Sequence, residues 1–228
     1  MTETSSWRLA GSRTAVVIGT AAAIAAVVAV AGCSARTSGA PRAGDAPRTS
    51  DAPQAGGAST GAAMPLRTLA AKAAPAGWHR LPMTGDGSVL ADLAYPPQMH
   101  PVAGDRGAAS AARLSPAGAY LMYLNATPRQ GQESLRDWPS FRVGHLLEDD
   151  ASKARLLGVS RGVRFLGGTG TCVLDTYVTR IKANHYTEIA CFVQGAISAS
   201  VIVAAAPAAG WARVSGLLLR AVAAYQVR

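Results

Sequence analysis

Two stretches of the chain beyond residue 78 alternate between apolar and polar positions, as half-buried β-strands do. In residues 89–95 the apolar positions fall on one strand face, and two prolines then end the pattern: Val89, Ala91, Leu93 and Tyr95. Residues 108–114 show a weaker alternation, a Ser-Pro-Ala-Gly turn follows, and residues 119–126 form a strong strand. The sequence therefore predicts a single strand and then a β-hairpin.

Helical spacing marks two further segments. Residues 133–150 predict a short turn through Trp138 and then a helix from Pro139, because proline is tolerated in the first turn of a helix. The side chains predicted to face inward are Trp138, Phe141, His145 and Leu146. Residues 207–225 predict a second helix with an apolar stripe of Trp211, Val214, Leu218, Val222 and Tyr225. Arg213 and Arg220 lie on another face, so we expect the stripe to dock on the sheet.

Three β-rich runs lie between the two helices, at residues 171–181, 186–193 and 197–205. Their short links predict an antiparallel meander. Residues 151–166 match neither strand nor helix clearly. The element order β-β-β-α-β-β-β-α predicts an α+β fold, with one antiparallel sheet of about six strands and flanking helices, as a single domain over residues 78–228.

The N-terminal segment carries a targeting signal. Arg8 and Arg13 precede an uncharged apolar run over residues 14–31, and Val30-Ala31-Gly32-Cys33 follows. This ending resembles the bacterial lipobox, which implies that residues 1–32 are a lipoprotein signal peptide and that Cys33 is acylated after cleavage. The alternative is an uncleaved membrane helix, for which the run lies at the lower limit of a spanning length.

Residues 33–77 predict the lipidated cysteine and a disordered tether rich in Ala, Gly, Pro and Ser. A doubly acylated cysteine is enough for stable anchoring, so we expect the domain on the extracytoplasmic face of a cell membrane. The net charge of +9 would draw it to anionic surfaces. No localised basic stripe with interleaved aromatic residues is visible, so we expect no nucleic-acid partner.

Two cysteines remain after Cys33. Cys172 and Cys191 lie on consecutive predicted strands, and an even pair in an exported chain favours a disulfide. Two buried free thiols are the alternative.

Candidate catalytic and metal-binding patterns are weak. Gly167-Gly168-Thr169-Gly170 is followed by a strand, which favours a turn over a phosphate loop. His185 and Glu188 are interpreted as solvated hairpin residues, and Glu148-Asp149-Asp150 as a solvated helix end. No set of three converging metal ligands and no serine nucleophile elbow is visible. We therefore expect no catalytic residues, no metal and no cofactor.

Candidate binding residues come from two groups. Arg129 and Gln130 follow a strong strand in a polar loop, where Arg129 is equally consistent with binding an anion and with tying the loop to the next helix. The second group is the densest basic set, whose alternative interpretation is a scattered solvated surface: Arg155, Arg161, Arg164, Arg180 and Lys182. From this set, Arg164, Arg180 and Lys182 join Arg129 and Gln130 as candidate binding residues.

Three blocks carry a family resemblance: residues 123–131 (Tyr-Leu-Asn-Ala-Thr-Pro-Arg-Gln-Gly), 167–173 (Gly-Gly-Thr-Gly-Thr-Cys-Val) and 186–191 (Tyr-Thr-Glu-Ile-Ala-Cys). They resemble a largely uncharacterised group of actinobacterial exported lipoproteins. Residues 78–228 are more distantly similar to LpqN-type lipoproteins and to the PsbP-like sandwich. The resemblance implies no catalytic residues and a surface module that binds a partner or ligand.

Two functions follow as hypotheses. The first is a lipid-anchored extracytoplasmic binding or accessory module of the cell envelope that recognises a protein, a wall polymer or a lipid. The alternative is an envelope hydrolase with an unrecognised site. Convergent titratable groups with perturbed pKa values in a cleft would favour the hydrolase, and an apolar groove would favour the binding module.

Overall fold

The computed structural model describes residues 66–149 and 151–228. The predicted signal peptide, the predicted acylation site Cys33 and most of the predicted tether lie outside the described residues. The last part of that tether does belong to the packed domain, because Leu66 and Leu69 are buried in its core. A short 3-10 turn, η1 (Leu66–Thr68), begins this part of the chain.

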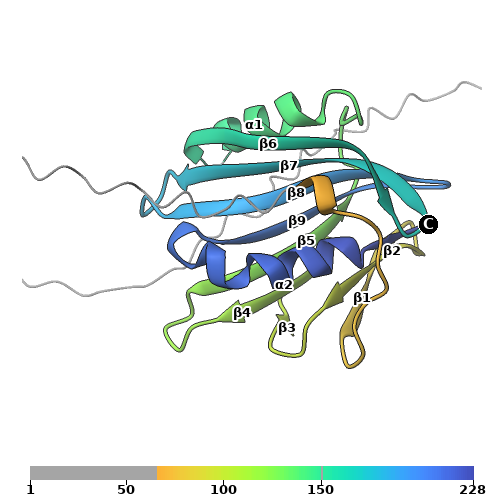
Figure 1. Cartoon of the computed structure of the whole chain (residues 1–228), viewed down its shortest axis with the longest axis horizontal. Helices are drawn as coiled ribbons and strands as arrows, with labels where there is room; N and C mark the ends of the chain where they lie inside the picture. Colours follow the sequence, from red (N-terminus) through yellow and green to blue (C-terminus); the bar gives the residue numbers. More distant parts are fainter. Residues whose placement is uncertain (1–65, 150) are drawn as a thin grey trace, which may run out of the picture.

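Seven strands of the described residues form one antiparallel sheet, in the order β3-β4-β5-β9-β8-β7-β6 (Figure 1). In chain order they are β3 (His100–Pro101), β4 (Ala109–Leu114), β5 (Tyr120–Pro128), β6 (Ala151–Phe165), β7 (Gly168–Thr179), β8 (His185–Gly195) and β9 (Ala199–Pro207). Consecutive pairing of β7, β8 and β9 confirms the predicted meander. The predicted hairpin is also confirmed, as β4 and β5.

A second, three-stranded sheet has the order β1-β2-β10. Its strands are β1 (His79–Gly85), β2 (Ser88–Tyr95) and β10 (Gln226–Val227). The small sheet packs against β4 and β5, where Met83 and Leu93 share a core with Met122 and Leu124. Two sheets and two helices make an α+β fold, which confirms the predicted fold class.

The two helices, α1 (Trp138–Asp149) and α2 (Trp211–Ala223), cover opposite faces of the large sheet. Trp138 of α1 packs with Val173 and Ala190, whereas Leu218 of α2 belongs to the core that contains Leu174 and Ile189. Because successive side chains along a strand point to opposite faces, these two sets lie on opposite sides of β7 and β8. The short turn η2 (Ala208–Gly210) leads into α2.

The C-terminal segment joins the two sheets. Val227 donates its backbone N–H to the carbonyl of Leu166 at 2.9 Å, and Arg228 donates to the carbonyl of Leu90 at 3.0 Å. Gly167, with φ +84°, forms the turn between β6 and β7, and a Cβ there would overlap the Val227 carbonyl oxygen. Glycine at this position is therefore required by backbone conformation and by close packing.

Several predictions need correction. Residues 151–166, which matched no pattern, form the long strand β6 as far as Phe165. Strands β1, β3 and β10 were not predicted, and the described residues form two sheets, of seven and three strands, in place of a single sheet of about six. The predicted second helix ends at Ala223, so Tyr225 lies beyond it, although its side chain is fully buried as expected.

Candidate functional site: a basic groove beside a buried ion pair

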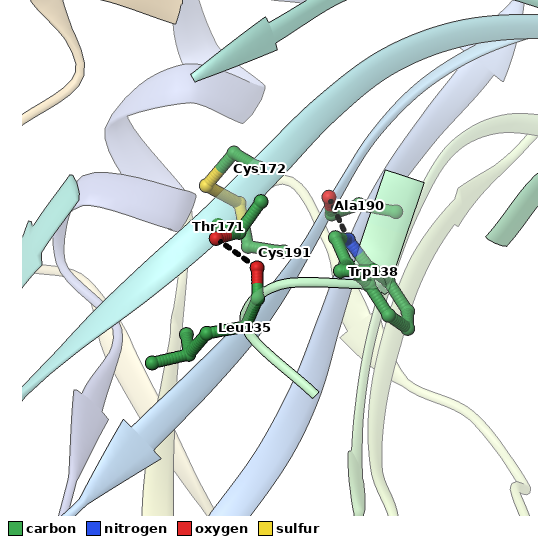
Figure 2. Close-up of a disulfide and its surroundings, with 6 residues drawn as sticks. All are labelled: Leu135, Trp138, Thr171, Cys172, Ala190 and Cys191. Carbon is green, nitrogen blue, oxygen red and sulfur yellow. Dashed lines mark hydrogen bonds between the residues drawn. A yellow bond between two sulfur atoms is a disulfide. The ribbon is translucent and has the colours of Figure 1, made fainter. Parts of the chain in front are cut away.

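The strands beneath α1 are fixed by a disulfide. Cys172 and Cys191 are directly paired in the register of β7 and β8, and they form the predicted bridge. Both residues are completely buried on the sheet face opposite α1 (Figure 2). The bridge joins strands that both contribute to the site described below.

The start of α1 is attached to the same strands by two hydrogen bonds (Figure 2). The indole Nε1 of Trp138 donates to the carbonyl of Ala190 at 2.9 Å, and the Thr171 hydroxyl donates to the carbonyl of Leu135 at 2.7 Å. Trp138 is almost completely buried and lies near the ring of Phe192 at 6.0 Å between centroids. The N-terminal end of α1 is therefore held in a fixed position on the sheet.

A shallow groove lies between this end of α1 and the neighbouring strands β6 and β7. One part has a volume of about 470 Å³ and is lined by Leu135, Arg136, Arg161, Gly162, Thr169, Gly170 and Thr171. The second part has a volume of about 550 Å³ and is lined by Arg136, Pro139, Ser140, Val143, Leu156 and Arg161. Arg136 and Arg161 line both parts, so the two parts adjoin each other, and we refer to them together as the groove.

The two arginines differ in how firmly they are held. Arg161 donates from Nη1 to the carbonyls of Leu135 and Arg136, at 3.1 and 2.8 Å, which fixes its guanidinium beside the groove. The Arg136 side chain is 94% exposed, and its Nε lies 4.0 Å from an exposed carboxylate oxygen of Asp137. An exposed pair of this kind contributes little, so Arg136 remains available for a ligand. The groove thus combines one cation held by hydrogen bonds and one exposed cation with an apolar wall.

A buried ionic cluster lies beneath α1. Arg142 of α1 contacts Glu188 of β8 through Nε and Nη2, at 2.7 and 2.6 Å from the same carboxylate oxygen. Asp175 of β7 is paired with Glu188 in the register, and both carboxylates are completely buried. Both oxygens of Asp175 and the second oxygen of Glu188 have no hydrogen-bond partner among the described residues. Two carboxylates therefore share a single guanidinium.

This arrangement decides the protonation of Asp175. Burial raises the pKa of Asp175 to about 9, and the Glu188 carboxylate adds to the rise, while the Arg142 guanidinium opposes it. At neutral pH Asp175 therefore carries its proton, and Glu188 is the carboxylate that faces Arg142. Burial also raises the pKa of the nearby Tyr177 phenol, with Glu188 as the next cause.

The interpretation of Glu188 as a solvated hairpin residue is wrong, because its side chain is fully buried and paired with Arg142. His185, at the start of β8, is exposed as expected. The partner of Glu188 lies 46 positions earlier in the chain, so local sequence pattern contains no signal for the pair. The Gly167–Gly170 stretch forms the expected turn at Gly167 and then the first residues of β7.

The loop candidate Arg129 contacts its own loop. Its Nε donates to the Gly131 carbonyl at 3.0 Å and lies 3.9 Å from the Glu133 carboxylate. Glu133 is buried and also accepts the backbone N–H groups of Gln130 and Gly131. Of the two interpretations of Arg129, these contacts match the one in which it ties the loop to the segment before α1.

The remaining candidates lie at two ends of the sheet. Arg164 pairs with Thr169 near the β6–β7 turn, whereas Arg180 and Lys182 follow the other end of β7. Arg180 caps α1, because its guanidinium donates to the carbonyls of Leu147 and Glu148. Arg164 is exposed on β6, close to the end of the sheet where the groove lies. The five candidates therefore do not form one patch.

Within residues 66–149 and 151–228, no three His, Cys, Asp or Glu side chains converge as a metal site would require. No helix in this part of the chain is both long and apolar enough to cross a membrane. The groove residues Arg136, Ser140 and Leu156 were not predicted as a site. Arg136 lies just before α1 and Ser140 lies on it, whereas Leu156 lies on β6, a strand that the sequence did not identify.

No protein-family model matches the sequence, and no curated protein matches it. Solved structures resemble part of the chain. CyanoP, the cyanobacterial PsbP of Synechocystis sp. PCC 6803, shares 13% identity, with 66% of this chain and 92% of that chain covered and a TM-score of 0.43. A Pseudomonas aeruginosa protein of unknown function, PA94, described as a putative regulator, shares 10% identity over 64% of this chain and 94% of that chain, with a TM-score of 0.35.

A Bacteroides thetaiotaomicron structure shares 16% identity and has a TM-score of 0.36. The match covers 61% of this chain and only 45% of the Bacteroides chain. At these identities the likeness concerns the fold alone.

Proposed function

We propose that this protein is a lipid-anchored binding module on the extracytoplasmic face of a bacterial cell membrane, in the group of actinobacterial exported lipoproteins that its sequence resembles. The lipobox-like sequence at Cys33 supports the anchor. The buried Cys172–Cys191 disulfide supports an oxidising compartment, where such bridges form and persist. The domain itself supplies the binding surface.

The groove lined by Arg136 and Arg161 is the observation that carries the binding role. Its cations face a wall formed by Pro139, Val143 and Leu156, so the lining has a charged part and an apolar part. A ligand that fits both parts is an anion with an apolar portion. An envelope lipid, an acidic wall polymer with an apolar substituent, or a protein segment of the same character meets this requirement.

The alternative function, an envelope hydrolase, receives less support from the geometry. Asp175 has the perturbed pKa that a catalytic acid would need, but it is fully buried beneath α1 and does not line the groove. The buried carboxylates therefore support a structural role. Acid–base catalysis would need the carboxylate of Asp175 or Glu188 to be in contact with a substrate.

The anchor is tested by the variant Cys33→Ala in the native host. We expect loss of fatty-acid labelling and accumulation of the uncleaved precursor, because the cysteine thiol is the acceptor of the lipid. Cys172→Ala is the matched control, since that cysteine lies in the folded domain and its variant should retain the label. Fatty-acid labelling of the Cys33→Ala chain would contradict the proposal.

The groove is tested by photo-crosslinking in intact membranes with the anchor retained. A photoreactive residue at the exposed groove position Ser140 should give a specific adduct, and the same residue at Ala117, in the β4–β5 turn, should not. Arg136→Glu should remove the Ser140 adduct. Equal adducts at both positions, or an adduct that survives the charge reversal, would contradict a ligand in the groove.

A further inference from the structure

Strand β6 is one of the two edge strands of the large sheet, and within the described residues it pairs with β7 alone. Its side chains form an exposed basic and apolar strip. Leu156, Leu157 and Val159 are 38%, 45% and 41% exposed. The basic residues of the strand are all exposed: Lys153, Arg155, Arg161 and Arg164. From residue 151 to residue 165 the sequence contains no acidic residue. We call this strand and its exposed side chains the β6 strip.

We infer that the β6 strip docks on the anionic headgroups of the bilayer that carries the protein, and so gives the tethered domain a fixed orientation. This inference rests on the proposed lipid anchor. It adds a second contact with the membrane, made by the folded domain itself.

The chemistry of the strip matches an anionic bilayer surface. Each Lys or Arg close to an anionic leaflet is attracted to it, and the contributions of several such residues add. Exposed leucine and valine side chains gain further free energy when they enter the boundary between headgroups and acyl chains. In the strip, Leu157 and Val159 lie between Arg155 and Arg161 in the chain, so exposed apolar and cationic side chains are interspersed along this edge of the sheet.

A second copy of the chain fits the strip poorly. Antiparallel pairing of two β6 strands would place four cations of one copy beside four of the other, and like charges on paired strands are destabilising. The β6–β7 ladder also contains register shifts at three places, between Ala151 and Lys153, Leu156 and Gly158, and Ser160 and Val163. Bulges of this kind protect an edge against added strands, which disfavours an acidic peptide paired through its backbone.

The route of the chain toward the anchor supports the same surface. The described domain begins at Leu66, whose turn η1 packs against β6 and β7. The Leu66 side chain is adjacent to Gly158. The described part of the chain therefore begins beside the strip. The segment between Cys33 and Leu66 cannot occupy the strip by charge attraction, because residues 34–65 contain three arginines and only two acidic residues.

The test uses the full-length lipidated chain in vesicles and measures hydrogen–deuterium exchange. In vesicles that contain phosphatidylglycerol, we expect the amides of residues 151–165 that do not bond to β7 to exchange about tenfold more slowly than in phosphatidylcholine vesicles. Arg155→Glu with Arg164→Glu should abolish this protection. The control Arg80→Glu with Arg113→Glu has the same change in net charge at exposed strand positions elsewhere and should retain it.

The apolar contribution has its own pair of variants. Leu157→Gln should weaken the protection, whereas Ile197→Gln, at a 75% exposed position in the β8–β9 turn, should not. Vesicle flotation and the mass of the chain report the lipid anchor separately from the exchange measurement. An unacylated chain would contradict the proposed function. An acylated chain without protection of β6 would contradict the docking. Protection that appears only after a protein extract is added, or that is equal in both lipids, would also contradict docking on anionic lipid.

Discussion

Asp175 and Glu188 lie directly opposite each other on β7 and β8, completely buried, with the single guanidinium of Arg142 to balance them. Burial and the adjacent carboxylate keep the Asp175 proton in place at neutral pH. The cluster therefore carries one net ion pair and one neutral acid. Its stability depends on the pH in a direction that can be predicted.

We expect Asp175→Asn to stabilise the protein at pH 8. The folded protein keeps the Asp175 proton up to about pH 9, whereas the unfolded chain releases it near pH 3.8. The contribution of this residue to the free energy of unfolding is therefore complete below pH 4 and declines as the pH rises to about 9. Asparagine has no proton to lose and removes that decline. Thermal unfolding should show a melting temperature several degrees above wild type at pH 8, since each kcal/mol is worth about 2–4 °C at this size.

The control for that experiment is Asp86→Asn, at an exposed carboxylate in the β1–β2 turn. Its melting temperature should follow the wild-type dependence on pH. If Asp175→Asn also reproduced the wild-type profile between pH 4 and 9, the raised pKa of Asp175 would be excluded.

Removal of the cation should have the opposite effect. Arg142→Met leaves Glu188 buried without a counterion, which costs about 3–5 kcal/mol of unfolding free energy. Urea denaturation measures the loss, and Arg136→Met, at a nearby exposed position, should leave the midpoint unchanged within about 0.5 kcal/mol. The double variant Arg142→Met with Glu188→Gln should recover much of the stability, and its failure to do so would point to lost packing instead of an unpaired charge.

The disulfide should contribute measurable stability. Cys172 and Cys191 are separated by 19 positions, and a closed loop of that size is worth about 3 kcal/mol in the chain-entropy model. The double variant Cys172→Ala with Cys191→Ala should lower the free energy of unfolding by roughly that amount. Thermal unfolding should show this loss as a lower melting temperature. Mass spectrometry of the unreduced protein should recover the two linked peptides, and alkylation of both thiols in the native protein would contradict the bridge.

Helix α2 should be an integral part of the core. Leu218 is completely buried in the core that it shares with the large sheet, and truncation of such a side chain costs about 2–5 kcal/mol. Leu218→Asp should therefore unfold or strongly destabilise the domain. Arg220→Ala, at an exposed position on the same helix, should be nearly silent. A deletion of residues 207–228 that left the melting temperature unchanged would show that α2 is detachable.

The parts of the fold that local pattern determines were predictable. The meander was visible because its links are short, and the Cys172–Cys191 pairing follows from two consecutive strands. The stripe on α2 was correct because one helix face meets one sheet face. In each of these cases the deciding residues are close together in the sequence.

The parts that depend on distant partners were not predictable. Strand β6 was missed because its three register shifts interrupt the alternation by which strands are recognised. Strand β1 contains Pro82 and ends at Gly85, both of which are depleted in strands. Glu188 resembled a solvated hairpin residue, since nothing near it in the sequence shows that Arg142 will cover it. The groove was missed for the same reason, because α1 and β6 meet only in the folded chain.

The position of β10 constrains the order in which the protein is completed during synthesis. Residues 226–228 join the small sheet to the turns at Leu166 and Ser198 through hydrogen bonds, yet they are made after every other element of the described domain. Until they emerge, β1 and β2 form a hairpin whose free edge has no partner. Within the described domain, the third strand of the small sheet is therefore supplied by the last residues to be made, so this sheet reaches its full width only after they pair with β2.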